Sequence, residues 1–144
     1  MIIYESKSVY KKIGEVPSVD TIDGPGGAVD YMRGAFKEYP LQEQVWVLQL
    51  SRKNHIKSRE MVALGTSTGC LVCPSLIFRP AILQGCPAVI VVHNHPSGDP
   101  SPSSADMRMC DQINKCGDIL KIDMLDFLVI GHNKHWSAND VGLI

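Results

Sequence analysis

Hydrophobic stretches alternate along the chain with turn-forming segments, and their lengths and spacing predict the secondary structure. Residues 45–50 are rich in β-branched and aromatic side chains, which predicts a largely buried strand. Residues 51–54 have the composition of a hairpin turn, and the return strand is expected at about residues 55–65. Further strands are predicted at residues 88–93, 124–131 and 135–137.

Hydrophobic residues at helical spacing lie between these strands. A helix is predicted for residues 26–37, ending before Pro40, because the residue before a proline disfavours helical dihedrals. A second covers residues 76–84, with Pro74 near its start, and a third covers about residues 103–116, with Gly117 ending it. The order strand, strand, helix, strand, helix, strand predicts an α/β fold with a mixed sheet flanked by helices.

Composition and charge limit the classes of partner. A chain of 144 residues fits one domain with a substantial core. The net charge is −1 and the only adjacent basic pairs are Lys11-Lys12 and Arg52-Lys53, whereas nucleic-acid binding usually leaves a basic footprint. Charge therefore does not support a nucleic-acid partner.

Cysteine usage and hydrophobicity predict a soluble protein of the cytoplasm. Five cysteines are an odd number, and the first ten residues lack the apolar segment of a signal peptide, so reduced thiols are expected. Cys70 and Cys73 have the spacing of a zinc knuckle or redox pair, but no second pair follows, which favours buried apolar cysteines. The longest strictly apolar run, residues 88–92, is far too short to span a membrane, so no membrane partner is expected.

The most informative chemistry follows the buried strand at residues 88–92. Side chains alternate in an extended segment, so His93 and His95 can converge on one ion while Asn94 points away. The turn formers between residues 96 and 102 can fold the chain back and bring Asp106 to the same place. Two imidazoles and a carboxylate leave one position of a tetrahedral zinc ion open, which is typical of catalytic sites. This pattern predicts a hydrolase.

Two further features accompany this ligand set. A metal-activated water needs a base outside the ligand shell, and Glu43 stands at the start of the buried strand at residues 45–50. Ser103 and Asp106 also have the spacing of a helix capping box. Asp99, in the loop after His95, is a fallback ligand.

These residues resemble the JAMM motif of the RadC-like branch of the JAB/MPN superfamily. That motif is Glu, then His-x-His, seven residues, Ser, two residues and Asp, and it matches His93, His95, Ser103 and Asp106 here. The resemblance extends from about Glu43 to the C-terminus. It implies a single-domain curled sheet of JAB/MPN (cytidine-deaminase-like) architecture at residues 25–144, with residues 1–24 as an N-terminal extension.

The resemblance also implies a role for each motif residue. His93, His95 and Asp106 would bind zinc (Zn2+), and Glu43 would act as general acid and base. Ser103 would help to hold the metal-bound water or stabilise the oxyanion. Glu60, on the return strand, is the alternative to Glu43, which is preferred because the acid of this family opens the first strand of the hairpin.

The expected function is zinc-dependent hydrolysis of an amide or isopeptide bond in a peptide or an isopeptide-linked protein. The alternative is a DNA-repair or DNA-processing factor without peptidase activity, as the traditional family name suggests. A nucleobase deaminase needs His-x-Glu followed by Pro-Cys-x-x-Cys, and this chain has neither that ligand set nor that order. A non-catalytic binding module would be expected to have lost a ligand, and all three ligands are present.

Overall fold

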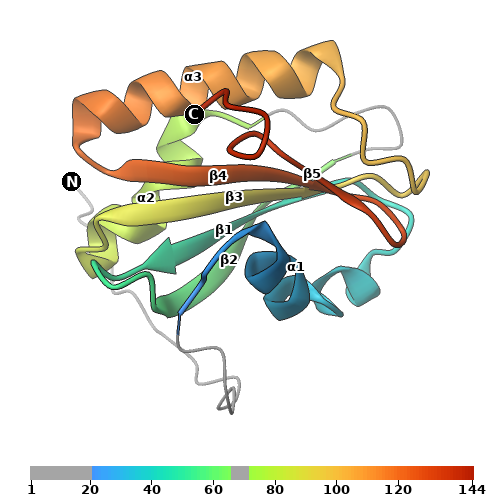
Figure 1. Cartoon of the computed structure of the whole chain (residues 1–144), viewed down its shortest axis with the longest axis horizontal. Coiled ribbons are helices and arrows are strands. Elements are labelled where there is room, and N and C mark those ends of the chain that lie inside the picture. Colours follow the sequence, from blue (N-terminus) through green and yellow to red (C-terminus); the bar gives the residue numbers. More distant parts are fainter. Residues whose placement is uncertain (1–20, 66–71) are drawn as a thin grey trace, which may run out of the picture.

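The computed structural model describes residues 21–65 and 72–144 as an α/β domain (Figure 1). Lys11-Lys12, Cys70 and most of the N-terminal extension predicted at residues 1–24 lie outside the described residues. The strands are β1 (Gln44–Leu50), β2 (Ile56–Leu64), β3 (Ala88–Asn94), β4 (Asp123–Ile130) and β5 (His135–Ser137). The helices are α1 (Pro25–Met32), the 3-10 helix η1 (Ala35–Glu38), α2 (Pro74–Gln84) and α3 (Ser104–Leu120).

The strands form one mixed sheet in the order β2-β1-β3-β4-β5. Among the strands of the described residues, β3 and β4, which α3 connects, pair in parallel, and the other neighbours pair antiparallel. One face packs against α2 and α3 and the other against α1, as the two hydrophobic clusters and Figure 1 show. Because both faces are covered, all seven residues of β3 are buried. The predicted fold class is confirmed.

The helix predicted for residues 26–37 is interrupted at Gly34 in the structure. The α-helix ends at Met32, and Gly34 adopts a left-handed backbone with φ of 88° before η1 begins. A left-handed residue cannot continue a right-handed helix, and glycine takes this conformation without the usual steric cost. The predicted single helix is therefore divided into two short ones.

Gly117 does not end the third helix, contrary to the expectation from sequence. The helix α3 continues to Leu120, and its left-handed C-cap is Lys121, with φ of 58°. A Cβ added at Gly117 would lie 2.6 Å from the Ile122 carbonyl oxygen and 3.3 Å from Cζ of Phe78 in α2. Glycine is needed here because α3 closely approaches both groups, which the sequence pattern does not reveal.

Replacing Gly117 with alanine is expected to lower the free energy of unfolding by about 1–3 kcal/mol, the usual cost of an extra methyl group in a filled site. This loss exceeds the gain of up to about 1 kcal/mol that alanine brings to a helix interior. Urea denaturation measures the change. The matched control is Gly27→Ala in α1, where the nearest atom would lie 3.8 Å from the new Cβ, so the same substitution should be neutral or stabilising. Equal effects at the two sites would contradict the close contact.

The four described cysteines are free. Cys86 and Cys110 are buried as expected, and burial raises the pKa of the Cys110 thiol to about 11. Cys73 is exposed, which corrects the prediction of buried cysteines: it is the N-cap of α2, directly before Pro74. A hydrogen bond with the Ser75 hydroxyl lowers the pKa of Cys73.

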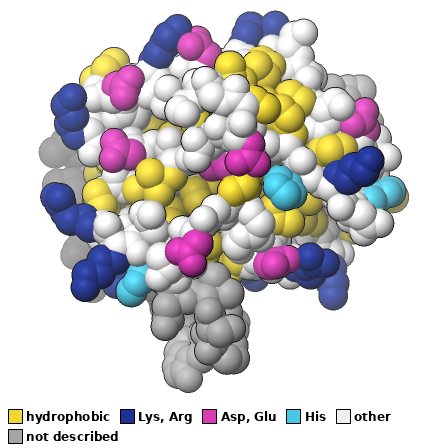
Figure 2. Space-filling model, viewed as in Figure 1, with side chains coloured by type: hydrophobic (Ala, Val, Ile, Leu, Met, Phe, Trp, Pro, Cys, Tyr) yellow, Lys and Arg dark blue, Asp and Glu magenta, His cyan; other side chains and the backbone are white. Residues whose placement is uncertain are grey.

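One face of the molecule is mixed in charge. On the face seen in Figure 2, basic and acidic side chains are interspersed with hydrophobic atoms. Within residues 21–65 and 72–144, no helix combines the length and hydrophobicity that a membrane crossing requires.

Candidate metal centre

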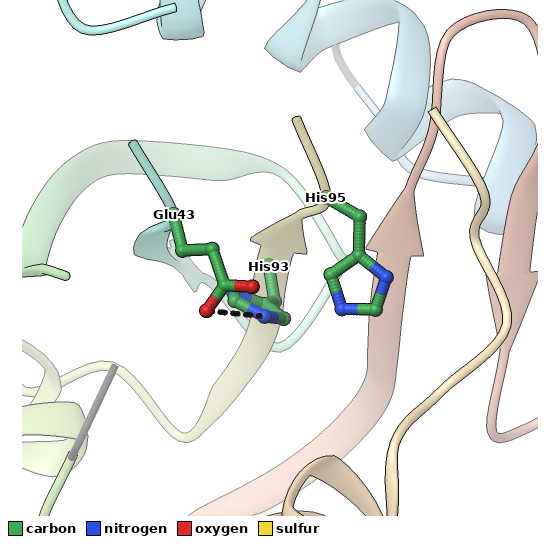
Figure 3. A group of neighbouring side chains, drawn as sticks. All are labelled: Glu43, His93 and His95. Atoms are coloured by element: carbon green, nitrogen blue, oxygen red, sulfur yellow. Dashed lines mark ion pairs between the residues drawn. The ribbon is translucent and has the colours of Figure 1, made fainter. Parts of the chain in front are cut away.

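The ends of β1 and β3 place Glu43 beside the two histidines. Val45 of β1 pairs with His93 of β3, so Glu43, two residues before Val45, projects from the same face as His93. The Glu43 Oε2 atom lies 3.9 Å from Nε2 of His93. His95 follows directly after β3, where its backbone N–H donates to the Ile130 carbonyl. Figure 3 shows the three side chains converging. The centroids of the two imidazole rings are 4.9 Å apart.

Asp106 reaches both histidines from the first turn of α3. Its Oδ1 atom lies 3.5 Å from Nε2 of His93, and its Oδ2 atom lies 3.3 Å from Nε2 of His95. The loop between β3 and α3 turns back at Gly98, which has a φ of 89° that favours glycine. The structure therefore brings together the four residues that the sequence motif separates by up to 63 positions, from Glu43 to Asp106.

A capping box fixes the Asp106 carboxylate. The backbone N–H and the hydroxyl of Ser103 both donate to Oδ2 of Asp106, at 2.6 and 2.7 Å. In return, the Asp106 backbone N–H donates to the Ser103 hydroxyl oxygen, at 3.1 Å. The hydroxyl proton of Ser103 is thus directed to Asp106, and the role of Ser103 toward a water or an oxyanion stays a prediction.

The other ring nitrogen of each histidine is held by a backbone carbonyl. Nδ1 of His93 donates to the Gln44 carbonyl at 3.1 Å, and Nδ1 of His95 donates to the Asp99 carbonyl at 2.8 Å. Since a carbonyl oxygen can only accept, Nδ1 carries the proton and Nε2 presents its lone pair. Burial lowers the pKa of His93, which favours the neutral imidazole that a metal ligand requires.

Asp99 contributes its backbone to the site, and its carboxylate is engaged elsewhere. That carboxylate accepts hydrogen bonds from the N–H and the hydroxyl of Ser101, and these bonds lower the pKa of Asp99. The fallback ligand of the sequence analysis is therefore better described as the residue that orients His95.

The donor set fits a zinc ion. Ligands about 2.0–2.1 Å from a tetrahedral centre lie about 3.3–3.4 Å from one another. Asp106 lies at similar distances from the two histidines but through different oxygens, with Oδ1 3.5 Å from Nε2 of His93 and Oδ2 3.3 Å from Nε2 of His95. Among the described residues, the group in which one donor atom of each residue lies within 4.8 Å of the others is Glu43, His93 and His95, without Asp106, which makes Glu43 a competing ligand. We favour Asp106 because its contacts are shorter than the 3.9 Å between Glu43 and His93.

Sheet register separates the two candidate bases. Glu60 of β2 pairs with Val47 of β1, whereas His93 of β3 pairs with Val45. Glu60 therefore lies further along the sheet than His93, and the strand β1 separates its strand β2 from β3. The Glu60 side chain is exposed. The structure places Glu43 and not Glu60 beside His93, while the proton transfer itself stays a prediction.

Sequence reasoning missed two buried amides that support the site. Asn94 was expected to point away from the ion, and its side chain does enter the opposite side of the sheet, where it binds the backbone of Gln42 and Gln44. Gln44 is fully buried, and its side-chain amide donates to the carbonyls of Phe36 and Tyr39. The available signal was polar residues next to or within hydrophobic strands, since a buried amide requires hydrogen-bond partners.

Comparison with known proteins agrees with this geometry. A model of the family described as RadC-like JAB domain matches residues 22–143. A UPF0758 protein of Chlorobaculum tepidum is 38% identical over 123 residues, which cover 85% of this chain and 55% of that protein. A UPF0758 protein of Pelodictyon phaeoclathratiforme is 37% identical over 142 residues, covering 99% of this chain and 60% of that protein.

The similarity also extends to archaea. A UPF0758 protein of Methanosarcina acetivorans is 39% identical over 103 residues, which cover 72% of this chain and 45% of that protein. The chain thus spans about half the length of the relatives it matches. With a family match over most of its length, the chain belongs to the RadC-like JAB domain family.

Proposed function

We propose that this chain is a zinc-dependent hydrolase domain that cleaves an amide or isopeptide bond. The observation that carries the proposal is the position of Asp106, whose two carboxylate oxygens lie 3.5 and 3.3 Å from the Nε2 atoms of His93 and His95. Neutral imidazoles and a single carboxylate, with one position left for solvent, form the ligand set of a catalytic zinc site.

Each residue of the site would have its own role in the reaction. Bound zinc would polarise the scissile carbonyl and lower the pKa of a water to about 7. Glu43, whose side chain is 28% exposed, would accept the proton at its carboxylate and return it to the departing amine. Ser103 would hold Asp106 in place through the capping box. To hold the metal-bound water or stabilise the oxyanion as well, its hydroxyl would have to turn from Asp106 toward the reacting oxygen.

The proposed substrate is a peptide or an isopeptide-linked protein, and the proposed compartment is the cytoplasm. The substrate class follows from the family resemblance. The compartment is supported by the free, exposed Cys73, which suits a reducing environment. No basic cluster in the sequence favours DNA as the partner, since the net charge is −1.

Metal analysis combined with hydrolysis assays tests this proposal. The purified chain is expected to retain one equivalent of zinc and to cleave at least one member of a panel of peptide and isopeptide substrates. A chelator should abolish this cleavage, and added zinc should restore it. Failure to retain zinc would reject the site. Retained zinc with no cleavage across the panel would reject the hydrolase and favour a binding module, and a mobility-shift titration with salt then tests DNA.

A further inference from the structure

The side chain of Asn94 continues the sheet at the point where backbone pairing between β1 and β3 ends. The last paired residues are Val45 and His93, so Gln44 and Asn94 would form the next pair. Instead, Oδ1 of Asn94 accepts the backbone N–H of Gln44 at 2.6 Å. Nδ2 of the same amide donates to the Gln42 carbonyl at 3.3 Å. One amide therefore binds the backbone on both sides of Glu43.

Other contacts hold the same three residues. The Glu43 carbonyl accepts the Gly65 N–H at 2.7 Å, and the Gln44 carbonyl accepts Nδ1 of His93 at 3.1 Å. The backbone carbonyls of Gln42, Glu43 and Gln44 are thus all engaged. The path of the chain through Glu43 is thus held from both neighbouring strands. The Asn94 side chain binds the backbone at both ends of this path, and the Tyr39 carbonyl accepts from the Gln42 backbone and from the Gln44 side chain.

The Glu43 carboxylate depends on this path for its position. Among the described residues its nearest charged or ionisable partner is His93, whose Nε2 atom is 3.9 Å from Oε2, and no side-chain hydrogen bond of Glu43 is formed there. The backbone that carries Glu43 sets how closely its carboxylate can approach His93. A misplacement of about 1 Å at a reacting group can reduce a rate by about 100-fold.

We infer that Asn94 is a positioning residue that holds Glu43 at the distance from the metal site needed for proton transfer, and this inference rests on the function proposed above. Asn94 acts from the side of the sheet opposite the metal ligands, so it supports the base without touching the ion. The position requires one group that donates and accepts at once, which an amide provides and a carboxylate or an alkyl side chain does not. Asn94→Asp keeps the acceptor for Gln44 but loses the donor to Gln42.

The test compares Asn94→Ala and Asn94→Asp with the wild type, all loaded with zinc. Asn94→Ala should retain one equivalent of zinc, and amide exchange of Gln44, followed by NMR, should accelerate at least tenfold. Asn94→Asp should keep this amide protected. In both variants the value of kcat should fall, by about 10–100-fold in Asn94→Ala, with KM within about twofold. Combining Asn94→Ala with Glu43→Gln should cause no loss beyond that of Glu43→Gln, because both changes act on one step.

A matched control separates positioning from general loosening of the strand. Gln49 is also a buried amide of β1, and it binds the Val47 carbonyl and the Ser58 hydroxyl at the far end of the strand. Gln49→Ala therefore removes similar buried bonds but should leave both the exchange of the Gln44 amide and kcat within about twofold of the wild type. An equal loss of kcat in Gln49→Ala and Asn94→Ala would overturn the inference.

A crystal structure of zinc-loaded Asn94→Ala tests the position of Glu43 independently of activity. If the alanine variant does not fold, Asn94→Asp takes its place. The Glu43 carboxylate should move by about 1 Å or occupy more than one position, relative to its 3.9 Å separation from His93 in the wild type. An unmoved Glu43 would overturn the inference. If Glu43 is displaced but the wild type hydrolyses nothing, Asn94 still positions Glu43, and it is the proposed function that is overturned.

Discussion

Replacing His95 with alanine is expected to abolish stoichiometric zinc binding. The side chain supplies one of three proposed donors, and its Nε2 atom lies 3.3 Å from Asp106. Loss of a residue that only supports a ligand costs about 10–100-fold in metal affinity, so loss of a ligand itself should cost more than about 100-fold. Elemental analysis after dialysis and competition with a chromophoric chelator measure the effect.

The control for this substitution is His55→Ala. His55 is exposed in the turn between β1 and β2, away from the site, and its loss should leave zinc content and affinity unchanged. Urea denaturation of the metal-free proteins checks that both variants fold. If His95→Ala binds one equivalent with the affinity of the wild type, the assignment of the metal centre is wrong.

Glu43→Gln is expected to keep the metal and lose turnover. The amide has the size of the carboxylate but cannot take up the proton, and general-base catalysis contributes about 10²–10⁴-fold to a rate. The value of kcat should therefore fall by that factor while zinc remains at one equivalent. Steady-state kinetics on the best substrate of the panel, together with elemental analysis, measure the two quantities.

The matched control is Glu60→Gln, which removes the competing carboxylate of β2. Glu60 pairs with Val47 and lies away from the histidines, so kcat should stay within about twofold of the wild type. Loss of zinc in Glu43→Gln would identify Glu43 as a ligand, in agreement with its place in the group of Glu43, His93 and His95. Unchanged turnover in Glu43→Gln would reject it as the proton carrier.

The sequence predicted those features that depend on local spacing. Alternation of side chains along an extended strand placed His93 and His95 on one face, and the structure has the same arrangement because His93 lies in β3 and His95 follows directly after it. The capping box of Ser103 and Asp106 spans a single helical turn, and its hydrogen bonds are present. The order of strands and helices was likewise predictable, because periodicity in each segment reflects which side faces the core.

Tertiary contacts decided the features that the local pattern misplaced. Gly117 was expected to end a helix, but it lies inside α3 because the Ile122 carbonyl and Phe78 leave no room for a Cβ. Cys73 was expected to be buried, but it caps α2 at the surface. In each case the residue type has two common uses, and only the neighbouring element determines which one applies.

By itself, the sequence determined the fold class, the family resemblance and the three proposed ligands, because short-range spacing and hydrophobic periodicity encode them. Only the tertiary structure decided that Glu43 rather than Glu60 lies beside His93, since this depends on the register of β1 against its neighbours. It also revealed the support of Glu43 by Asn94, which joins positions about 50 residues apart. Contacts at such separations leave no periodic trace in a single sequence, because they arise only when the strands pair.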